Sequence, residues 1–218
     1  MEYKSQYGQD KWIAEEVFPK KKDGYFVELA AGDGIYLSNT YYLEKALDWK
    51  GLCIEPNKTS YESLILNRSC DCSDSVVMED GHEVDFIQYE KVTGYEHLLS
   101  TVQGASIANA PIESITKHIA VSLDTLLDQQ KAPQVIDYIS MDIEGSEIYV
   151  LQDFLPKNKR TVIAWSIECH IGSSHEQALL QWMEAYDYNR ILKDGQNGRL
   201  AHDYLFIHKS YNNNERNS

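Results

Sequence analysis

The stretch YFVELAAGDG, residues 25–34, decides the fold of this chain. Residues 25–30 form a mostly apolar run, which is typical of a strand buried inside a sheet. Gly32 and Gly34 then predict a turn, because glycine adopts the backbone angles that turns require. Open α/β sheets bind ligands beyond the carboxyl ends of their strands, so this turn is a candidate ligand site.

Segments typical of strands and of helices alternate around this stretch. Asp10 is predicted to cap a first helix that ends at Pro19, and Ser38 or Asn39 to cap the helix after the glycine turn. The alternation predicts a doubly wound, Rossmann-like α/β fold with a mostly parallel sheet and helices on both faces. Extended segments are expected at 52–54, 70–78, 83–87, 135–141, 161–167, 191–192 and 204–207, and helices around 61–65, 122–127, 148–155 and 177–186.

Residues 92–118 interrupt this alternation. The segment shows little periodicity and contains Gly94, Gly104 and Pro111. Irregular stretches of this length inside a domain are usually functional or disordered. We therefore expect either a lid or substrate loop here, or plain disorder.

The length and composition fit one domain. The chain has 218 residues, so a single α/β domain over residues 1–209 and a frayed tail over 210–218 are expected. No apolar run is long enough to cross a bilayer, and the first residues are too polar for a signal peptide. These features predict a cytoplasmic protein, or one domain of a larger polypeptide, that makes no membrane contact.

The net charge and the spacing of the cysteines argue against nucleic acid and zinc, respectively, as binding partners. The formal net charge of −14 repels phosphate backbones, which argues against nucleic acid as a partner. The four cysteines, Cys53, Cys70, Cys72 and Cys169, lack the spacing of a zinc site and are expected to be reduced.

Acidic residues follow the first predicted strands. Glu28 precedes the glycine turn and Asp33 lies within it, where they suit a ligand that carries an ammonium and a sulfonium group. Glu55 ends the second strand, where a carboxylate can accept hydrogen bonds from a ribose diol. Asp74 in the third strand is a candidate acceptor for an adenine amino group, although an outward-facing polar position explains it nearly as well.

The richest cluster is DIEGSE, residues 142–147, after the strand at 135–141. A carboxylate at Asp142 leaves a buried strand and needs a cation, a metal or hydrogen-bond donors as partner. Capping of the next helix by Asp142 or Glu144 is the structural alternative. Glu168 and His170 end the next strand, where His170 is a candidate general base or a partly exposed histidine with one backbone bond.

These segments, in this order and spacing, resemble the FkbM-type methyltransferases, a family of class I S-adenosylmethionine-dependent enzymes. The resemblance spans nearly the whole chain. It rests on SQYGQD (5–10), VELAAGDG (27–34), IEP (54–56), NR (67–68), MDIEGSE (141–147) and DYLF (203–206). One departure is Ala31, where many class I enzymes have glycine.

The resemblance implies a seven-stranded sheet whose last strand is antiparallel, S-adenosylmethionine as cofactor, and O-methylation, often of sugar or polyketide hydroxyls. Asp142, Glu168 and His170 are then the candidate catalytic residues, with Asp142 and Glu168 as Mg²⁺ ligands in an alternative mechanism. The predicted cofactor-binding residues are Gln9, Glu28, Ala30, Gly32, Asn39, Glu55, Asp74 and Asp142.

The expected acceptor is a small molecule or glycan, and most specifically a carbohydrate hydroxyl. Tyr95, His97 and the polar run 100–109 are candidate sugar contacts. Two other function classes stay open. The first is an NAD(P)-dependent oxidoreductase, which the missing third glycine and the acidic turn disfavour. The second is an inactive cofactor-binding module, against which the intact acidic strand ends argue.

Overall fold

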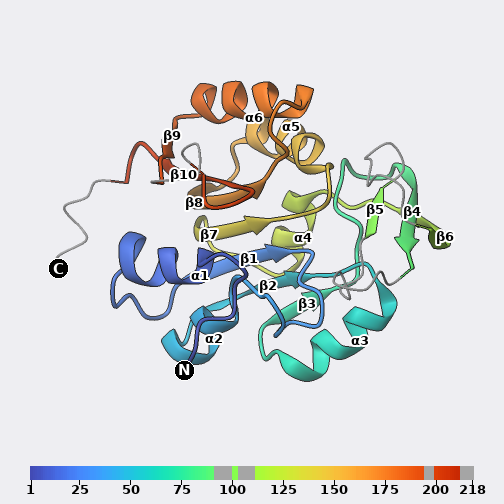
Figure 1. The fold of residues 1–218 in the computed structure, drawn as a ribbon, viewed down its shortest axis with the longest axis horizontal. Coiled ribbons are helices and arrows are strands. Elements are labelled where there is room, and N and C mark those ends of the chain that lie inside the picture. Colours follow the sequence, from blue (N-terminus) through green and yellow to red (C-terminus); the bar gives the residue numbers. More distant parts are fainter. Residues whose placement is uncertain (91–99, 103–110, 194–198, 212–218) are drawn as a thin grey trace.

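The protein forms a seven-stranded sheet with helices on both faces and a smaller three-stranded sheet at one side (Figure 1). The computed structural model describes residues 1–90, 100–102, 111–193 and 199–211. The elements are α1 (Gln9–Lys11) with a π-helical continuation (Trp12–Val17), β1 (Tyr25–Leu29), α2 (Tyr41–Leu47), β2 (Lys50–Ile54), α3 (Lys58–Asn67), β3 (Asp71–Ser73), β4 (Glu83–Tyr89), β5 (Ser100–Val102), β6 (Ile112–Ile119), α4 (Leu123–Gln129), β7 (Val135–Met141), α5 (Glu147–Lys157), β8 (Thr161–Glu168), α6 (Ser174–Ala185), β9 (Tyr188–Ile191) and β10 (Asp203–His208).

The large sheet has the order β3-β2-β1-β7-β8-β10-β9. The pairs from β3 through β8 are parallel, and β10 is antiparallel to both β8 and β9. The doubly wound, mostly parallel sheet and its antiparallel late strand confirm the predicted fold class. In such a sheet the parallel strands all end at one edge, and β10 begins there.

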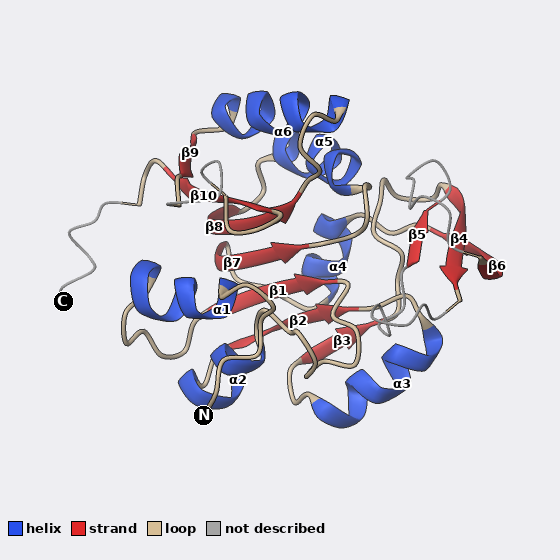
Figure 2. Ribbon diagram, in the orientation of Figure 1, coloured by secondary structure: helices blue, strands red, loops and turns tan. Residues whose placement is uncertain are grey.

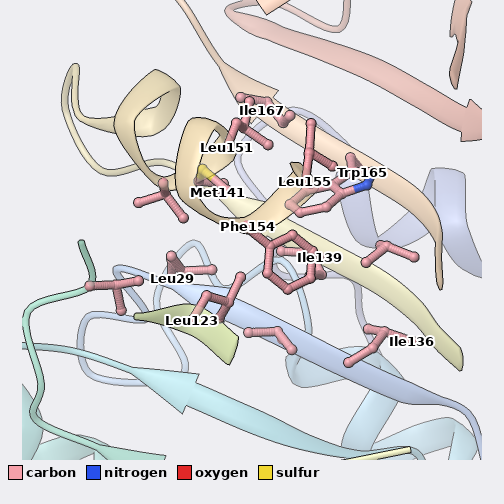
Figure 3. Packing of buried hydrophobic residues seen from close by; sticks show 14 of the residues in the cluster. Leu29, Leu123, Ile136, Ile139, Met141, Leu151, Phe154, Leu155, Trp165 and Ile167 are labelled. Atoms are coloured by element: carbon pink, nitrogen blue, oxygen red, sulfur yellow. The ribbon is translucent and has the colours of Figure 1, made fainter. Parts of the chain in front are cut away.

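Alternating side chains of each strand build two cores. Val27 and Leu29 of β1 pack with the helices α4, α5 and α6, whereas Phe26 packs with the N-terminal helix, α2 and α3. In the first core, Trp165 of β8 lies edge-on to Phe154 of α5, with 5.9 Å between ring centroids (Figure 3). Because both faces of the central strands are buried, their sequences read as continuous apolar runs.

Three expectations about local structure are wrong. Asp10 does not cap the first helix; Gly8 occupies that position, and the Asp10 carboxylate instead accepts hydrogen bonds from the backbone N–H groups of Lys4 and Ser5. The third strand covers only Asp71–Ser73, not 70–78, because the Ser75 backbone N–H bonds the Ser73 hydroxyl and Val77 pairs only in an isolated bridge with Val121. Thr40, and not Ser38 or Asn39, occupies the N-cap position of α2, although the Ser38 hydroxyl accepts hydrogen bonds from the Thr40 and Tyr41 backbone N–H groups. The extended run predicted at 83–87 is confirmed as β4, which belongs to the small sheet.

The segment 92–118 is partly regular, contrary to expectation. Its described parts include β5 and β6, which pair with β4 in the antiparallel order β5-β4-β6. Six of the eight positions of β6 are exposed, so β6 lacks the apolar run by which a buried strand is recognised. Residues 91–99 and 103–110, including Tyr95 and His97, lie outside the described residues, as does most of the expected tail. At the start of that tail, Tyr211 donates a hydrogen bond to the Val17 carbonyl at 3.0 Å.

A buried guanidinium connects the first loop to the sheet. The Arg68 side chain is fully buried and contacts the carboxylates of Glu28, at 3.3 Å, and Glu44, at 2.5 Å. It also donates to the Gly34 carbonyl at 3.2 Å. Gly34 has a φ of +81°, and a Cβ there would lie 2.6–2.7 Å from Leu64 and Arg68, so the turn needs glycine for both space and conformation.

Replacing the guanidinium should destabilise the fold strongly. In the variant Arg68→Met, the buried Glu28 carboxylate loses its counter-charge and Glu44 keeps only its pair with Lys45, so we expect the free energy of unfolding to fall by about 3–5 kcal/mol. Urea denaturation measures this. The matched control is Lys22→Met, which breaks an exposed pair with Asp48 and should change little. Similar midpoints for the two variants would contradict the structural role of Arg68.

Candidate functional site

The carboxyl ends of the parallel strands meet at the edge of the large sheet that faces the small sheet. The arrowheads of β1, β2 and β7 point toward the side where β4, β5 and β6 lie (Figure 2). A hydrogen bond joins the two parts: the hydroxyl of buried Thr101 in β5 donates to the backbone carbonyl of Glu144 at 3.0 Å. The small sheet therefore contacts the loop that carries the acidic cluster.

Glu55 connects the ends of β1 and β2. Its carboxylate accepts hydrogen bonds from the backbone N–H groups of Gly32 and Asn57, both at 2.8 Å. Burial raises the pKa of Glu55 to about 7, although these two donors favour the ionised form. A Cβ at Gly32 would meet no atom within 4 Å, so the backbone there borders open space that a ligand can approach.

The Glu28 carboxylate binds residues of the loop between β1 and α2. Its oxygens accept hydrogen bonds from the Ser38 and Thr40 hydroxyls at 2.8 and 2.6 Å and from the Asn39 backbone N–H at 2.5 Å. Together with Arg68 these donors occupy the carboxylate. The structure thus shows a loop-fixing role for Glu28, and the predicted contact with cofactor stays a prediction.

The other predicted cofactor residues lie along the same edge. Ala30 is exposed, with a φ of +58°, between β1 and Gly32. The Asn39 amide donates to the Ser140 hydroxyl at 2.8 Å, while its buried Oδ1 has no partner among the described residues. Asp74 is exposed just beyond β3.

Asp142, Glu147 and Glu168 converge at the ends of β7 and β8. One carboxylate oxygen of each residue lies within 4.8 Å of those of the other two. Glu147 accepts from the backbone N–H groups of Ile143 and Gly145, at 2.9 and 3.2 Å, so it also fixes the loop between β7 and α5. Neither alternative cap is observed at that helix, because Ser146 occupies the N-cap position.

Crowding and like charge raise the pKa values of these acids. Burial, followed by the neighbouring carboxylates, raises the pKa of Glu147 and of Glu168 to about 7 and that of Glu144 to about 8. Asp142 retains an exposed surface, yet protein atoms crowd its carboxyl group; loss of hydration and then Glu168 raise its pKa well above the usual range. Glu147 and Glu168 are therefore partly protonated near neutral pH.

Asp203 is a buried member of this group, and its sequence pattern does not predict a role in the site. It begins β10 directly opposite Glu168 in the antiparallel pairing, and burial raises its pKa to about 7. The buried Gln9 amide donates to it at 3.0 Å, which places the predicted Gln9 at this site. The signal available in the sequence was the antiparallel last strand, because such a strand starts where its parallel neighbours end.

His170 follows β8, next to the acidic cluster, but no contact of its side chain with the three acids is observed among the described residues. The residue is exposed, and its backbone carbonyl accepts a hydrogen bond from the Ser173 hydroxyl at 2.8 Å. Asp142 and Glu168 thus meet as expected, and the proposed role of His170 stays a prediction. No helix among the described residues is long and apolar enough to cross a membrane.

The chain matches one protein family and resembles several solved structures at low sequence identity. The sequence profile of the methyltransferase FkbM domain matches residues 28–190. No curated protein matches the chain. Similar solved structures include a TehB-like SAM-dependent methyltransferase from Corynebacterium glutamicum, with 10% identity over 93% of this chain and 86% of that one and a TM-score of 0.48. Another is a putative rRNA-methylase from Clostridium thermocellum, with 10% identity over 94% and 96% of the two chains and a TM-score of 0.45. Similarity at this level says nothing about the acceptor.

The raised pKa values predict that the protein loses stability as pH rises. An acid whose folded pKa is raised from 4.5 to about 7 stabilises the fold fully below 4.5, and this contribution is lost as pH rises through about 7. We expect the melting temperature to fall between about pH 5 and 8, and Glu168→Gln to reduce that fall. Glu62→Gln, at an exposed position of α3, is the control. A melting temperature that rises over this interval would contradict the assignment.

Proposed function

Because the chain belongs to the FkbM methyltransferase family, we propose that it is an S-adenosylmethionine-dependent O-methyltransferase whose acceptor is a carbohydrate hydroxyl. The observation that carries this proposal is the position of the acids. Glu55 lies beside the open Gly32 backbone, and the carboxylates of Asp142, Glu147 and Glu168 converge at the same edge of the sheet.

The first part of the edge suits the cofactor. Glu55 still has lone pairs available beyond the two backbone N–H bonds it accepts, and a ribose diol offers two hydroxyl donors to such a carboxylate. The exposed Ala30 and the open face of Gly32 let a ligand approach the backbone closely. Negative charge along the edge favours a ligand that carries an ammonium group and a sulfonium.

The second part of the edge suits the acceptor. S-adenosylmethionine, when bound, supplies an electrophilic methyl group. A sugar hydroxyl attacks it well only as its proton leaves, and a carboxylate with a pKa near 7 accepts a proton at neutral pH and later returns it to water. Glu168 has such a pKa, and Asp142 lies next to it. In this proposal the two residues share the proton of the acceptor hydroxyl and orient the hydroxyl for in-line transfer.

The same oxygens fit a second mechanism. Mg²⁺ prefers oxygen ligands, and Asp142, Glu147 and Glu168 offer only oxygens. A cation there would neutralise the acids, orient a sugar diol and acidify one of its hydroxyls. The sequence named Asp142 and Glu168 for this role, and Glu147 completes the group.

Two readings compete with methyl transfer to a sugar. An oxidoreductase would bind NAD(P), whose pyrophosphate the acids of this edge would repel. A module without activity would bind cofactor but transfer no methyl group. For the acceptor class itself, the family resemblance and the negative charge favour a neutral hydroxyl compound over a phosphorylated one.

Removing the Glu55 carboxylate should weaken cofactor binding. We expect Glu55→Ala to cost about 1.5–3 kcal/mol in the affinity for S-adenosylmethionine and S-adenosylhomocysteine, the range for a hydrogen bond to a charged group. Calorimetry with both ligands and with NAD measures this, and Glu62→Ala on exposed α3 is the control. Tighter binding of NAD than of S-adenosylhomocysteine would overturn the proposed cofactor.

Asp142→Asn should separate catalysis from cofactor binding. We expect turnover to fall by about 10²-fold or more, the range for loss of a positioned base, while cofactor affinity changes less. Turnover is followed by mass spectrometry of methylated products from a panel of sugars, proteins and catechols. Asp71→Asn, an exposed position on β3, is the control.

The same assay distinguishes the two mechanisms. Activity that disappears with EDTA and returns with Mg²⁺ supports the metal, and activity unaffected by EDTA supports the bare base. Methylation of proteins or catechols with no sugar product would overturn the carbohydrate acceptor. Cofactor binding with no product from any of the compounds would favour the inactive module.

A further inference from the structure

Two cysteine side chains meet behind the first loop, away from the proposed acceptor site. Cys53 lies in β2, fully buried, and Cys70 lies between α3 and β3, half-buried. Their Sγ atoms are 3.6 Å apart. Cys72 stands opposite Cys53 in the pairing of β2 with β3, and its Sγ lies 3.6 Å from the Cys70 carbonyl oxygen.

The surroundings favour the thiolate at Cys70. The thiols of Cys53 and Cys72, and then the Arg68 guanidinium, lower the pKa of Cys70. Burial raises the pKa of Cys53, which stays a thiol. A partly exposed thiolate beside a buried thiol is the arrangement in which an oxidised sulfur is resolved by its neighbour.

We propose that Cys53 and Cys70 form a redox-modification site whose reactant is a hydroperoxide. The Cys70 thiolate attacks the peroxide, so that the O–O bond breaks, sulfur takes up one oxygen as a sulfenic acid, and the other oxygen leaves as hydroxide. The Cys53 sulfur then displaces the sulfenic oxygen, which departs with the thiol proton as water, and a disulfide forms. A small dithiol reverses the step and is itself oxidised to a disulfide.

The geometry requires only a small movement. A disulfide has an S–S distance of about 2.05 Å, so the two sulfurs must approach by about 1.5 Å. Cys53 lies in β2, which is paired on both sides, with β1 and with β3. Cys70 lies in the connection between α3 and β3. The movement therefore falls on Cys70 and on the end of α3.

That movement reaches the first loop through Arg68. Arg68 precedes Cys70 by two positions and binds the Glu28 carboxylate and the Gly34 carbonyl. The Cys53 Sγ itself lies 3.9 Å from Glu28 Oε2. Formation of the disulfide displaces the Arg68 guanidinium and so loosens the loop that borders the proposed cofactor site. This consequence rests on the proposed function, whereas formation of the disulfide does not.

The first experiment tests the bond. The full chain is reduced, treated with hydrogen peroxide, denatured, alkylated and digested without reductant, and the linked peptides are identified by mass spectrometry. We expect a Cys53–Cys70 link that dithiothreitol removes, that is absent in Cys70→Ser and that persists in Cys169→Ser. A link between Cys70 and Cys72, or a sulfinic acid on Cys70 with Cys53 free, would overturn the proposal. Thermal melts of the reduced variants check that each is folded.

The second experiment tests the consequence. Affinity for S-adenosylhomocysteine is measured by calorimetry on reduced, oxidised and re-reduced protein. We expect Kd to rise by about 5-fold or more on oxidation, the lower end of typical coupling between sites, and to recover on reduction. In Cys70→Ser, Kd should not respond to peroxide. An unchanged Kd in protein that contains the disulfide would overturn the coupling, whereas failure of reduced protein to bind at all would count against the proposed function instead.

Discussion

The buried contact between Arg68 and Glu28 is the interaction on which the first loop depends. The guanidinium reaches from the end of α3 to the carboxylate of β1, and that carboxylate in turn holds the residues that lead into α2. A charge enclosed in this way costs free energy unless every donor and acceptor is matched. The chain matches them with Glu44 and the Gly34 carbonyl, so the loop beside Gly32 has one favoured conformation.

The opposite electrostatic situation holds at the ends of β7 and β8. There Asp142, Glu147 and Glu168 face one another, and the pKa values show that their negative charges are poorly compensated. Such a cluster lowers stability at neutral pH, and proteins commonly accept that cost where chemistry requires it. Cations and hydroxyl donors would relieve the repulsion, which is the physical reason for placing cofactor and acceptor along this edge.

The small sheet adds a second layer to that edge. Its strands β4 and β6 pair in an antiparallel sheet that is separate from the large, mostly parallel sheet. The Thr101 hydroxyl fixes the Glu144 carbonyl, at a residue with a positive φ of 57°. The conformation of the acidic loop thus depends both on Glu147 within it and on a strand inserted between β3 and α4.

The sequence by itself determined which segments form the main strands and which acids lie at their ends. Burial on both faces gives each strand a continuous apolar run, and glycines mark the turns, so both features can be seen locally in the sequence. The predicted strand 135–141 coincides with β7, and Glu55, Asp142 and Glu168 lie at the ends of β2, β7 and β8 as the sequence predicts. Only the tertiary structure decided which acids meet. Glu28 is turned toward Arg68, and Asp203 is brought opposite Glu168, through contacts between residues far apart in the chain. No local pattern encodes such contacts, since they follow from how the strands pair and where each side chain finds a partner.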